Sequence, residues 1–394
     1  MYNNRMLTRR RALWLGLAMV TGMSACAKGK LVKQDQQAQA VDKSERDFTV
    51  TGETSLKERA AAKGLIYGAS GRYRDLSSNS ELANHYTQEC AILVPGNDLK
   101  WPTLRPNRDR FNFTKGDWLA DFAHTHGMLF RGHTLVWNQG LPKWFKDTVN
   151  KRNAEHILVE HIQKVAGHYA GQMHSWDVVN EAVYPKHQRS DGLRRSPWLK
   201  FLGPDYIDLA FRAAAEADPK AILVYNDARM NTDTEDGEAT RVAVLKLLER
   251  LKSRGTPVHA LGMQAHLWAK DQAPFNPRKI RAFVGDVAAL GLKIMVTELD
   301  VKDKHLPTDT NLRDYFVAGA YEDYLSAVLD EPAVISVITW GLSDPYSWRT
   351  KPQFGGNRKD GTPVRALPLD AQMKRKLAWN AIARAFDNAP KRKA

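Results

Sequence analysis

The chain has 394 residues, 43% of them hydrophobic and 26% charged, with 13 Phe, 12 Tyr and 11 Trp. This composition excludes a disordered or fibrous protein and permits a sizeable core. The length suits two or three small domains, or one α/β barrel of about 250 residues or more. The net charge is +14, but seven basic residues lie at the two ends of the chain. No recognition motif accompanies the charge, so we expect no nucleic-acid partner.

The first 25 residues have the pattern of an export signal. An arginine run at 9–11 precedes the apolar stretch from Leu13 to Met23, which is too short to span a membrane. The arginines are typical of a twin-arginine signal, and Met23-Ser24-Ala25-Cys26 resembles a bacterial lipobox. We therefore expect an exported protein, periplasmic or at the cell surface, with a possible lipid anchor at Cys26. If Cys26 is the anchor, Cys90 is a lone thiol; a plain secretory signal with an incidental cysteine is the alternative.

The next expected segments are a polar tether at 26–55, a catalytic domain at 56–388 and a basic tail at 389–394. Within the domain, short apolar runs predict eight strands: 65–69, 91–94, 128–133, 174–179, 221–225, 258–264, 292–296 and 334–340. Between them, apolar residues recur at helical spacing in 117–126, 154–169, 206–217, 238–254 and 315–329. Eight strand-helix repeats predict the α/β fold class, a (β/α)8 TIM barrel in one domain. The alternative, a doubly wound open sheet, requires a GxGxxG turn after the first strand, and 67–71 lacks it.

A barrel of this kind carries its functional residues where the strands end. Polar and aromatic residues follow nearly every run: Asn97, Lys100, His133, Trp137, Asn180, Glu181, Asn226, Asp227, Gln264, His266, Glu298, Asp300, Trp340 and Trp348. Among them, Glu181 and Glu298 are isolated carboxylates at the ends of the fourth and seventh strands. Only the fold can bring these two residues together.

Two glutamates at a barrel mouth lined with tryptophans suit glycoside cleavage. One carboxylic acid protonates the leaving oxygen while an ionised partner attacks the anomeric carbon, and aromatic rings stack on sugars. Structural ion pairs are one alternative. A metal site with His133 and His266 is another, although no HExxH-type spacing exists, so we expect no metal and no cofactor.

Six segments carry a resemblance to a known family. They are Gly96-Asn97-Asp98-Leu99-Lys100-Trp101, Arg131 to Trp137, Trp176 to Glu181, Gln264-Ala265-His266, Thr297 to Asp300, and Thr339 to Asp344 followed by Ser347-Trp348. On these segments the chain resembles the glycoside hydrolase family 10 endo-β-1,4-xylanases over residues 56–386. The resemblance implies hydrolysis of β-1,4-xylosidic bonds in xylan or xylo-oligosaccharides with retention of configuration.

The resemblance also implies roles for single residues. Glu181 is the general acid/base, Glu298 is the nucleophile, and His266, positioned by Asp300, orients Glu298. Asn180 bonds the 2-hydroxyl of the sugar that is cleaved. Further sugar contacts are implied for Lys100, His133, Trp137, Gln264 and Trp340 at the cleavage point, and for Asn97 and Trp348 at its non-reducing-side neighbour.

The sequence departs from the family pattern at several positions. Gly96 and Gly140 stand where the family carries Glu and Gln, which hold the second sugar on the non-reducing side, and Asn138 replaces His. Ala228 removes an aromatic platform near the leaving-group sugar, and Arg229 adds a cation beside it. We therefore keep open a preference for short or decorated xylo-oligosaccharides or for cello-oligosaccharides.

Basic residues suggest one form of decoration. Arg229, together with Arg349, Lys351 and Arg358 after the eighth strand, leads us to expect a preference for acidic substituents such as glucuronic acid. The non-enzymatic alternative is a surface sugar-binding protein on a barrel scaffold. It predicts the loss of an acid or a nucleophile, and both glutamates are present.

Overall fold

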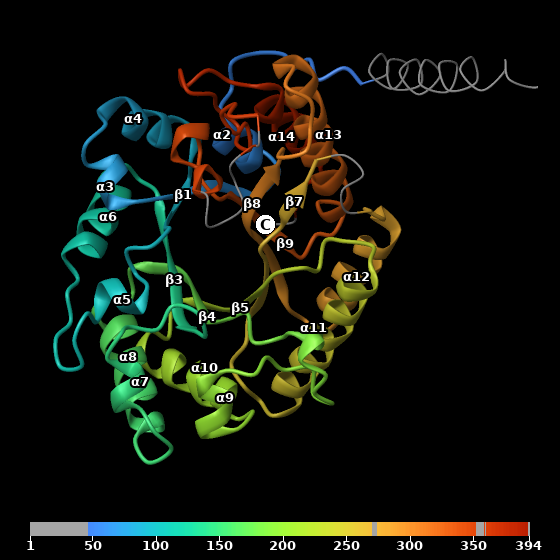
Figure 1. Ribbon diagram of the computed structural model, residues 1–394. Helices are drawn as coiled ribbons and strands as arrows, with labels where there is room; N and C mark the ends of the chain where they lie inside the picture. Colours follow the sequence, from blue (N-terminus) through green and yellow to red (C-terminus); the bar gives the residue numbers. More distant parts are fainter. Residues whose placement is uncertain (1–45, 270–273, 352–357, 359, 393–394) are drawn as a thin grey trace, which may run out of the picture. The chain divides into compact units, whose positions relative to one another are not determined.

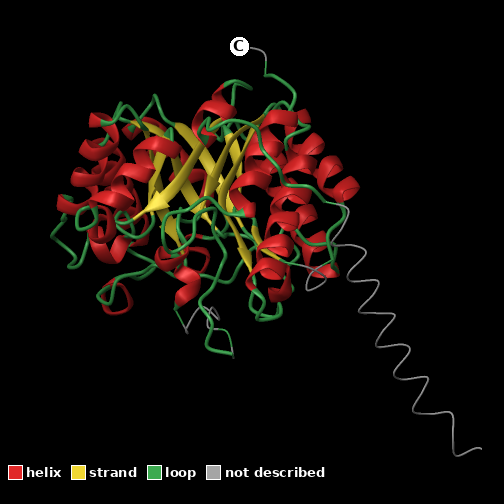
Figure 2. Cartoon of the chain, turned by 90° about the horizontal axis from the view of Figure 1, so that it is seen from above, coloured by secondary structure: helices red, strands yellow, loops and turns green. Residues whose placement is uncertain are grey.

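Parallel strands surrounded by helices make up the centre of the molecule (Figures 1 and 2). The structure is a computed structural model that describes residues 46–269, 274–351, 358 and 360–392. The strands are β1 (Ile66–Gly71), β2 (Ile92–Pro95), β3 (Leu129–Trp137), β4 (Met173–Asn180), β5 (Ile222–Asp227), β6 (Ala260–Met263), β7 (His266–Trp268), β8 (Lys293–Lys302) and β9 (Val334–Thr339). Pairing of β1 with β9 and of β6 with β8 closes the barrel. The predicted eight-stranded α/β barrel is confirmed.

The sixth predicted strand, 258–264, contains β6, and a short strand that was not predicted, β7, follows it. Strand β6 ends at Met263, and the backbone then turns at Ala265, whose φ of 58° lies in the left-handed region. Strand β7 follows and pairs with the far end of β8, where His266 lies beside Asp300. Gln264 and His266 therefore both reach the barrel mouth, one just after β6 and the other at the start of β7.

Helices cover the outside of the barrel. The longer ones are α4 (Ser80–Glu89), α6 (Thr114–Thr125), α8 (Ala154–His168), α10 (Tyr206–Ala217), α11 (Glu235–Ser253), α12 (Pro277–Ala289), α13 (Thr310–Val328) and α14 (Leu377–Asn388). Shorter segments are α2 (Leu56–Ala61), α3 (Tyr73–Leu76), α5 (Trp101–Leu104), α7 (Phe145–Thr148) and α9 (Pro197–Leu202), with 3-10 turns η1 (Pro185–His187), η2 (Asp344–Tyr346) and η3 (Trp348–Thr350). All five predicted helices are present, and the boundaries of α10 agree with the prediction at both ends.

The core has two layers. Six apolar side chains fill the barrel interior, namely Ile92, Val94, Val224, Ala260, Met295 and Ile338. A larger cluster lies between the strands and the helices. The interior also holds an ion pair between Arg131 of β3 and Asp177 of β4, both almost fully buried. The strands are therefore covered on both faces, which explains why they read as continuous apolar runs.

Both ends of the described chain belong to the fold. Phe48 is 4% exposed and contacts Tyr315 of α13, and the compact unit starts at Phe48. The boundary expected at residue 56 is therefore too late. Arg392, expected in a basic tail, donates to the carbonyls of Val334 and Leu329 and is largely buried. The predicted signal peptide and most of the tether, including Cys26, lie outside the described residues.

Within the described ranges, no helix is long and apolar enough to cross a membrane.

Candidate active site

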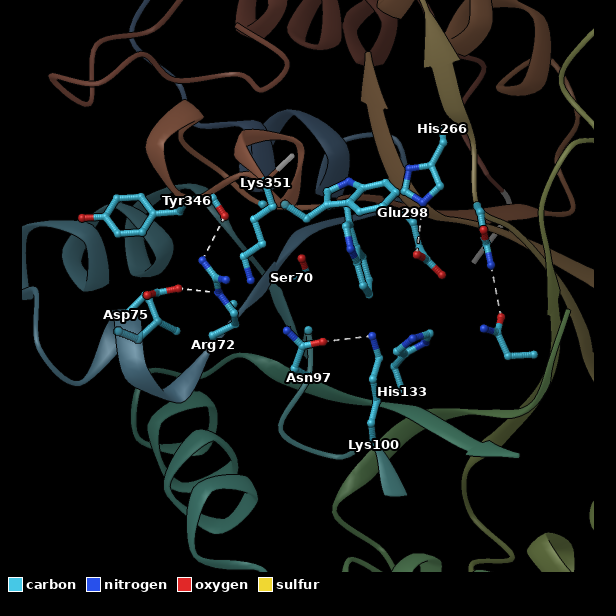
Figure 3. A pocket seen from close by; sticks show the side chains of 18 of the residues that line it. Ser70, Arg72, Asp75, Asn97, Lys100, His133, His266, Glu298, Tyr346 and Lys351 are labelled. Atoms are coloured by element: carbon cyan, nitrogen blue, oxygen red, sulfur yellow. Dashed lines mark hydrogen bonds and ion pairs between the residues drawn. The ribbon is translucent and has the colours of Figure 1, made fainter. Parts of the chain in front are cut away.

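One cavity of about 420 Å³ opens at the carboxyl ends of the strands. Eleven of the twelve predicted site residues line it: Asn97, Lys100, His133, Trp137, Asn180, Glu181, Gln264, His266, Glu298, Trp340 and Trp348. The twelfth, Asp300, lies behind His266. Figure 3 shows His133, His266 and Glu298 pointing into this space from different strands, and Lys100 pointing into it from the segment after β2. The fold thus brings together residues that are far apart in the sequence.

Glu181 follows the last residue of β4 and has a backbone φ of 57°. Its amide donates to the carbonyl of Asn226, so the turn remains attached to β5. The carboxylate accepts from Gln264 Nε2 at 3.2 Å and lies 3.5 Å from Arg194 Nη2, which also holds the Glu181 carbonyl through Nε. With 15% of its side chain exposed, Glu181 is fixed in place and still reaches the open cavity.

Glu298 lies within β8, and only 7% of its side chain is exposed. Asn226 Nδ2 donates to Oε1 at 2.9 Å, and His266 Nε2 lies 3.4 Å from Oε2. Burial alone would raise the pKa of Glu298, but the hydrogen bond from His266 and the charges of His133 and Lys100 outweigh it, so the pKa is lowered. The carboxylate is therefore held in its ionised form, as a nucleophile requires.

His266 connects Glu298 to a buried carboxylate. Its Nδ1 lies 2.9 Å from Asp300 Oδ1, which also accepts from Arg349 Nη2, while Trp348 Nε1 donates to Oδ2. Burial lowers the pKa of His266, but Asp300 and Glu298 raise it more, to about 9. Asp300 itself is buried, yet the neighbouring Arg349 and His266 lower its pKa. His266 is thus a cation between two anions.

Three amide side chains link the two glutamates. Asn180 Oδ1 accepts from Asn226 Nδ2 at 3.0 Å and from Gln264 Nε2 at 3.2 Å. Gln264 also bonds Glu181, and Asn226 also bonds Glu298. Both glutamates therefore belong to one hydrogen-bonded network around Asn180.

Asn226 can enter this network because the neighbouring position on β6 is a glycine. A Cβ at Gly262 would lie 2.3 Å from Asn226 Oδ1. Thr297 Oγ1 donates to the same oxygen at 2.7 Å and fixes the amide orientation. The nitrogen must then face Asn180 and Glu298.

The remaining predicted residues line the cavity on the side of β2, β3 and β9. Lys100 Nζ donates to Asn97 Oδ1 at 3.1 Å and lies 5.1 Å from the Trp137 ring centroid. Burial lowers the pKa of Lys100, although the nearby glutamates oppose this. His133 is held by Asp177 at 2.9 Å and meets the Trp340 ring edge-on at 5.2 Å.

The structure corrects the expectation for two of the four basic residues, Arg349 and Arg358. Arg349 is buried against Asp300, and Arg358 is buried with its guanidinium donating to backbone carbonyls such as that of Leu306. Arg229 lies 4.3 Å from the Tyr184 ring centroid and does not line the cavity. Only Lys351 of this group faces the cavity. Arg349 and Arg358 hold loop segments together and are too buried to meet an acidic substituent, whereas Arg229 is exposed outside this cavity.

Several residues at the site were not predicted. Asn226 and Asp177 were seen at strand ends or within a strand, but their contacts depend on pairing between strands. Arg72, Asp75 and Tyr346 line one end of the cavity, and only their positions after β1 and β9 could have indicated it. In the described part of the chain, no three His, Cys, Asp or Glu side chains are placed to hold a metal ion.

Paired glutamates at the carboxyl ends of a closed parallel barrel define the class of barrel glycoside hydrolases. Comparison with known families gives the same class and also identifies the family within it. Residues 55–385 match the family described as glycosyl hydrolase family 10, and the chain belongs to this family.

Individual relatives agree. Endo-1,4-beta-xylanase A from Humicola insolens is 38% identical over 67% of this chain and 67% of its own length. Endo-1,4-beta-xylanase B from Thermotoga neapolitana is 36% identical over 66% of this chain and 72% of its own. The crystal structure of xylanase 10B from Thermotoga maritima is similar with a TM-score of 0.76 at 34% identity, over 84% of this chain and 98% of that chain. Xylanase 10B from Thermotoga petrophila, solved in complex with xylobiose, also has a TM-score of 0.76, at 33% identity over 86% and 99%.

Proposed function

We propose that this protein is a retaining endo-1,4-β-xylanase in which Glu298 is the nucleophile and Glu181 is the general acid/base. The observation that carries the proposal is the contrast between two glutamates in one cavity. Glu298 is buried, bonded by Asn226 and His266, and has a lowered pKa. Glu181 is more exposed and lies at the open side of the same network. Two carboxylates with different environments are what a double displacement requires.

In the first step, a Glu298 oxygen attacks the anomeric carbon while the bond to the leaving oxygen breaks and Glu181 transfers its proton to that oxygen. The product is a covalent glycosyl-enzyme ester. In the second step, Glu181 takes a proton from water, the water oxygen bonds to the anomeric carbon, and Glu298 leaves as a carboxylate. The His266 cation stabilises the Glu298 carboxylate before the first step and again when it leaves in the second step.

Asn180 has a defined role in this scheme. Its Oδ1 already accepts two amide N–H groups, so its Nδ2 is left to donate to a sugar hydroxyl. We assign that hydroxyl to the 2-position of the sugar being cleaved. Lys100, His133, Trp137, Gln264 and Trp340 surround the same sugar, and Asn97 and Trp348 extend toward its neighbour.

The substrate follows from the family. The relatives named above are endo-1,4-beta-xylanases, and a similar structure holds xylobiose. Aromatic side chains at Trp137, Trp340 and Trp348 suit the apolar faces of xylose rings. We therefore take linear or decorated xylan as the polymer that this cavity cleaves.

Glu298→Gln tests the nucleophile. We expect the loss of nearly all xylanase activity with an unchanged melting temperature, because Gln keeps the shape but cannot form the ester. Glu331→Gln, on the turn before β9, is the matched control and should retain full activity. In parallel, NMR of the first product should show the β-anomer. Full activity in Glu298→Gln, or an α-anomer as first product, would overturn the mechanism.

We propose in addition that the chain is exported and anchored to a membrane through an acylated Cys26. The support is the apolar stretch from Leu13 to Met23 and the sequence Met23 to Cys26. Metabolic labelling with a radioactive fatty acid should mark the wild type and not Cys26→Ser. Equal labelling of both would exclude an anchor at this residue.

A further inference from the structure

The cavity extends past the two glutamates to an end built by three neighbouring strands, β9, β1 and β2. This end is lined by Arg72 and Asp75 after β1, by Gly96 and Asn97 after β2, and by Tyr346 and Lys351 after β9. If Glu181 protonates the leaving oxygen, the leaving group lies on the side of β4. The opposite end then receives the sugars on the non-reducing side. We call it the glycone end, and its assignment rests on the function proposed above.

Arg72 is held rigidly at the glycone end. Its Nε lies 2.5 Å from Asp75 Oδ2, and its Nη2 donates to the Tyr346 carbonyl at 3.2 Å. The side chain is 18% exposed. Asp75 also bonds a second arginine, because its other carboxylate oxygen accepts from Arg74 Nε at 3.2 Å. The guanidinium is thus fixed by two loops, while Nη1 has no hydrogen bond among the described residues.

Lys351 supplies a second cation at the same end. It lines the cavity, and among the described residues its amine has no ion-pair partner or side-chain hydrogen bond. In Figure 3 the Lys351 amine and the Arg72 guanidinium both point into the pocket, above Asn97. Asn97 uses its oxygen to accept from Lys100, which leaves its Nδ2 as a further donor.

The glycone end is therefore rich in donors and poor in acceptors. Gly96 contributes no side chain, and Arg72 takes up the space beside it, because a Cβ at Gly96 would lie 3.6 Å from Arg72 Cγ. The one carboxylate lining this end is Asp75, and arginines bond both of its oxygens. A neutral xylose offers hydroxyls, which donate as well as accept. A carboxylate only accepts, and it compensates both cations.

We propose that the glycone end is a subsite for a uronic acid unit, whose carboxylate is bound by Arg72 and Lys351 next to the cleaved sugar. Because the Arg72 guanidinium is already fixed, it loses little conformational entropy on binding. The amine of Lys351 can adjust to the position of the acid. Arg72 and Lys351 are then specificity-determining residues. The protein would select chains that carry an acidic group on the non-reducing side of the cleavage point.

A matched pair of substrates isolates the carboxylate. One is xylotetraose with a glucuronic acid substituent on a xylose of the non-reducing half, and the other is the same compound after carboxyl reduction, which leaves glucose in its place. We expect kcat/KM to be about tenfold or more higher for the acidic compound. We also expect 0.5 M NaCl to reduce this ratio, because salt screens the two cations. A ratio of one or below in the wild type would overturn the proposal.

Two variants test which residues cause the preference for the acidic compound. Lys351→Met and Arg72→Met should each lower the ratio several-fold with little change in kcat/KM for the reduced compound. Lys146→Met, on α7 and outside the cavity, is the control and should keep the wild-type ratio. Among the described residues the Lys351 amine has no ion pair or side-chain hydrogen bond, so its variant remains informative even if Arg72→Met disturbs the loop. A full ratio in Lys351→Met and in a folded Arg72→Met would contradict the assignment.

Unsubstituted xylotetraose separates this inference from the function on which it rests. If the wild type cleaves that compound and Glu298→Gln does not, the proposed function holds whatever the acidic ratio is. If neither enzyme cleaves any of the three compounds, the proposed function fails. If cleavage of the acidic and reduced compounds is equal, only the uronate subsite fails.

Discussion

At the scale of single residues, Asn226 joins the two halves of the site. One amide nitrogen donates both to Asn180 and to Glu298, while the amide oxygen is held by Thr297. Removing this nitrogen leaves Glu298 with one donor fewer and leaves Asn180 Oδ1 with Gln264 as its remaining donor. A hydrogen bond to a charged group is worth about 1.5–3 kcal/mol.

Asn226→Ala is expected to lower kcat on xylan by about tenfold to a hundredfold, with a smaller change in KM. The reason is that both contacts serve the reacting groups more than the binding of the polymer. Steady-state kinetics measure the two constants, and Asn84→Ala, exposed on α4, is the control. A change confined to KM would show that Asn226 acts in binding alone.

His266 gives a pH-dependent prediction. Its pKa is about 9 in the folded protein against an ordinary 6.5, because Asp300 and Glu298 outweigh the effect of burial. A raised pKa means that the folded state holds the proton more tightly. The contribution of this group to stability is therefore complete below pH 6.5 and is lost as the pH rises through about 9.

Denaturant unfolding of the wild type and of His266→Gln between pH 6 and 10 measures this contribution. The free-energy difference between the two proteins should shrink with rising pH, by on the order of 3 kcal/mol across the interval. Because other titrating groups are common to both proteins, they cancel in the difference. A difference that stays constant with pH would show that His266 is not the titrating group.

The sequence indicates residue types at the site better than their contacts. Glu181, Glu298 and His266 follow apolar runs and could be recognised there. The bond from Asn226 to Asn180, and the burial of Arg349 and Arg358, depend on how loops from different strands meet. Charge in a loop could not distinguish an arginine that faces substrate from one that supports Asp300.

At the scale of elements, the division between β6 and β7 determines the geometry of the site. The apolar run predicts a strand that ends at Gln264, and nothing in the sequence marks the left-handed turn at Ala265 or the short strand after it. The turn separates Gln264, which serves Asn180 and Glu181, from His266, which serves Glu298. Strands and helices follow from periodicity, whereas a turn between two short strands, such as the one at Ala265, follows from tertiary packing.

Gly262→Ala tests how closely β5 and β6 must approach. The added Cβ would meet Asn226 Oδ1 at 2.3 Å, so Asn226 or the strand must move. We expect a melting temperature lower by several degrees and a kcat reduced at least tenfold. Gly285→Ala, on α12 with open space around it, is the control and should stabilise the helix by up to about 1 kcal/mol. Normal activity in Gly262→Ala would mean that the network tolerates the shift.

At the scale of the whole molecule, the barrel is completed by the two ends of the described chain. Arg59 of α2 pairs with Asp387 of α14 at 2.5 Å, and Arg392 donates its backbone amide to the Lys63 carbonyl. The barrel and its helices could be predicted from eight repeats. The inclusion of Phe48 and Arg392 could not, because a single aromatic residue in a polar stretch and a single arginine in a basic tail carry no periodic signal.

Phe48→Ala is expected to destabilise the protein by about 3 kcal/mol, because a buried ring that packs on Tyr315 is lost. Denaturant unfolding measures the change, and the exposed Val242→Ala is the control, which should stay within about 0.5 kcal/mol. Activity at low temperature should be unaffected in both. If the free energy of unfolding fell by less than about 1 kcal/mol, Phe48 would belong to the tether and not to the folded domain.

The fastening of the C-terminal segment has a practical consequence. The Arg392 side chain donates a hydrogen bond to the Val334 carbonyl at the start of β9, and the cavity opens at the other end of that strand. A solid support or fused partner attached after Arg392 would therefore lie at the end of the barrel opposite the cavity. Long, insoluble polymers could still approach from the other side, which makes the carboxyl terminus the natural handle for immobilising the enzyme.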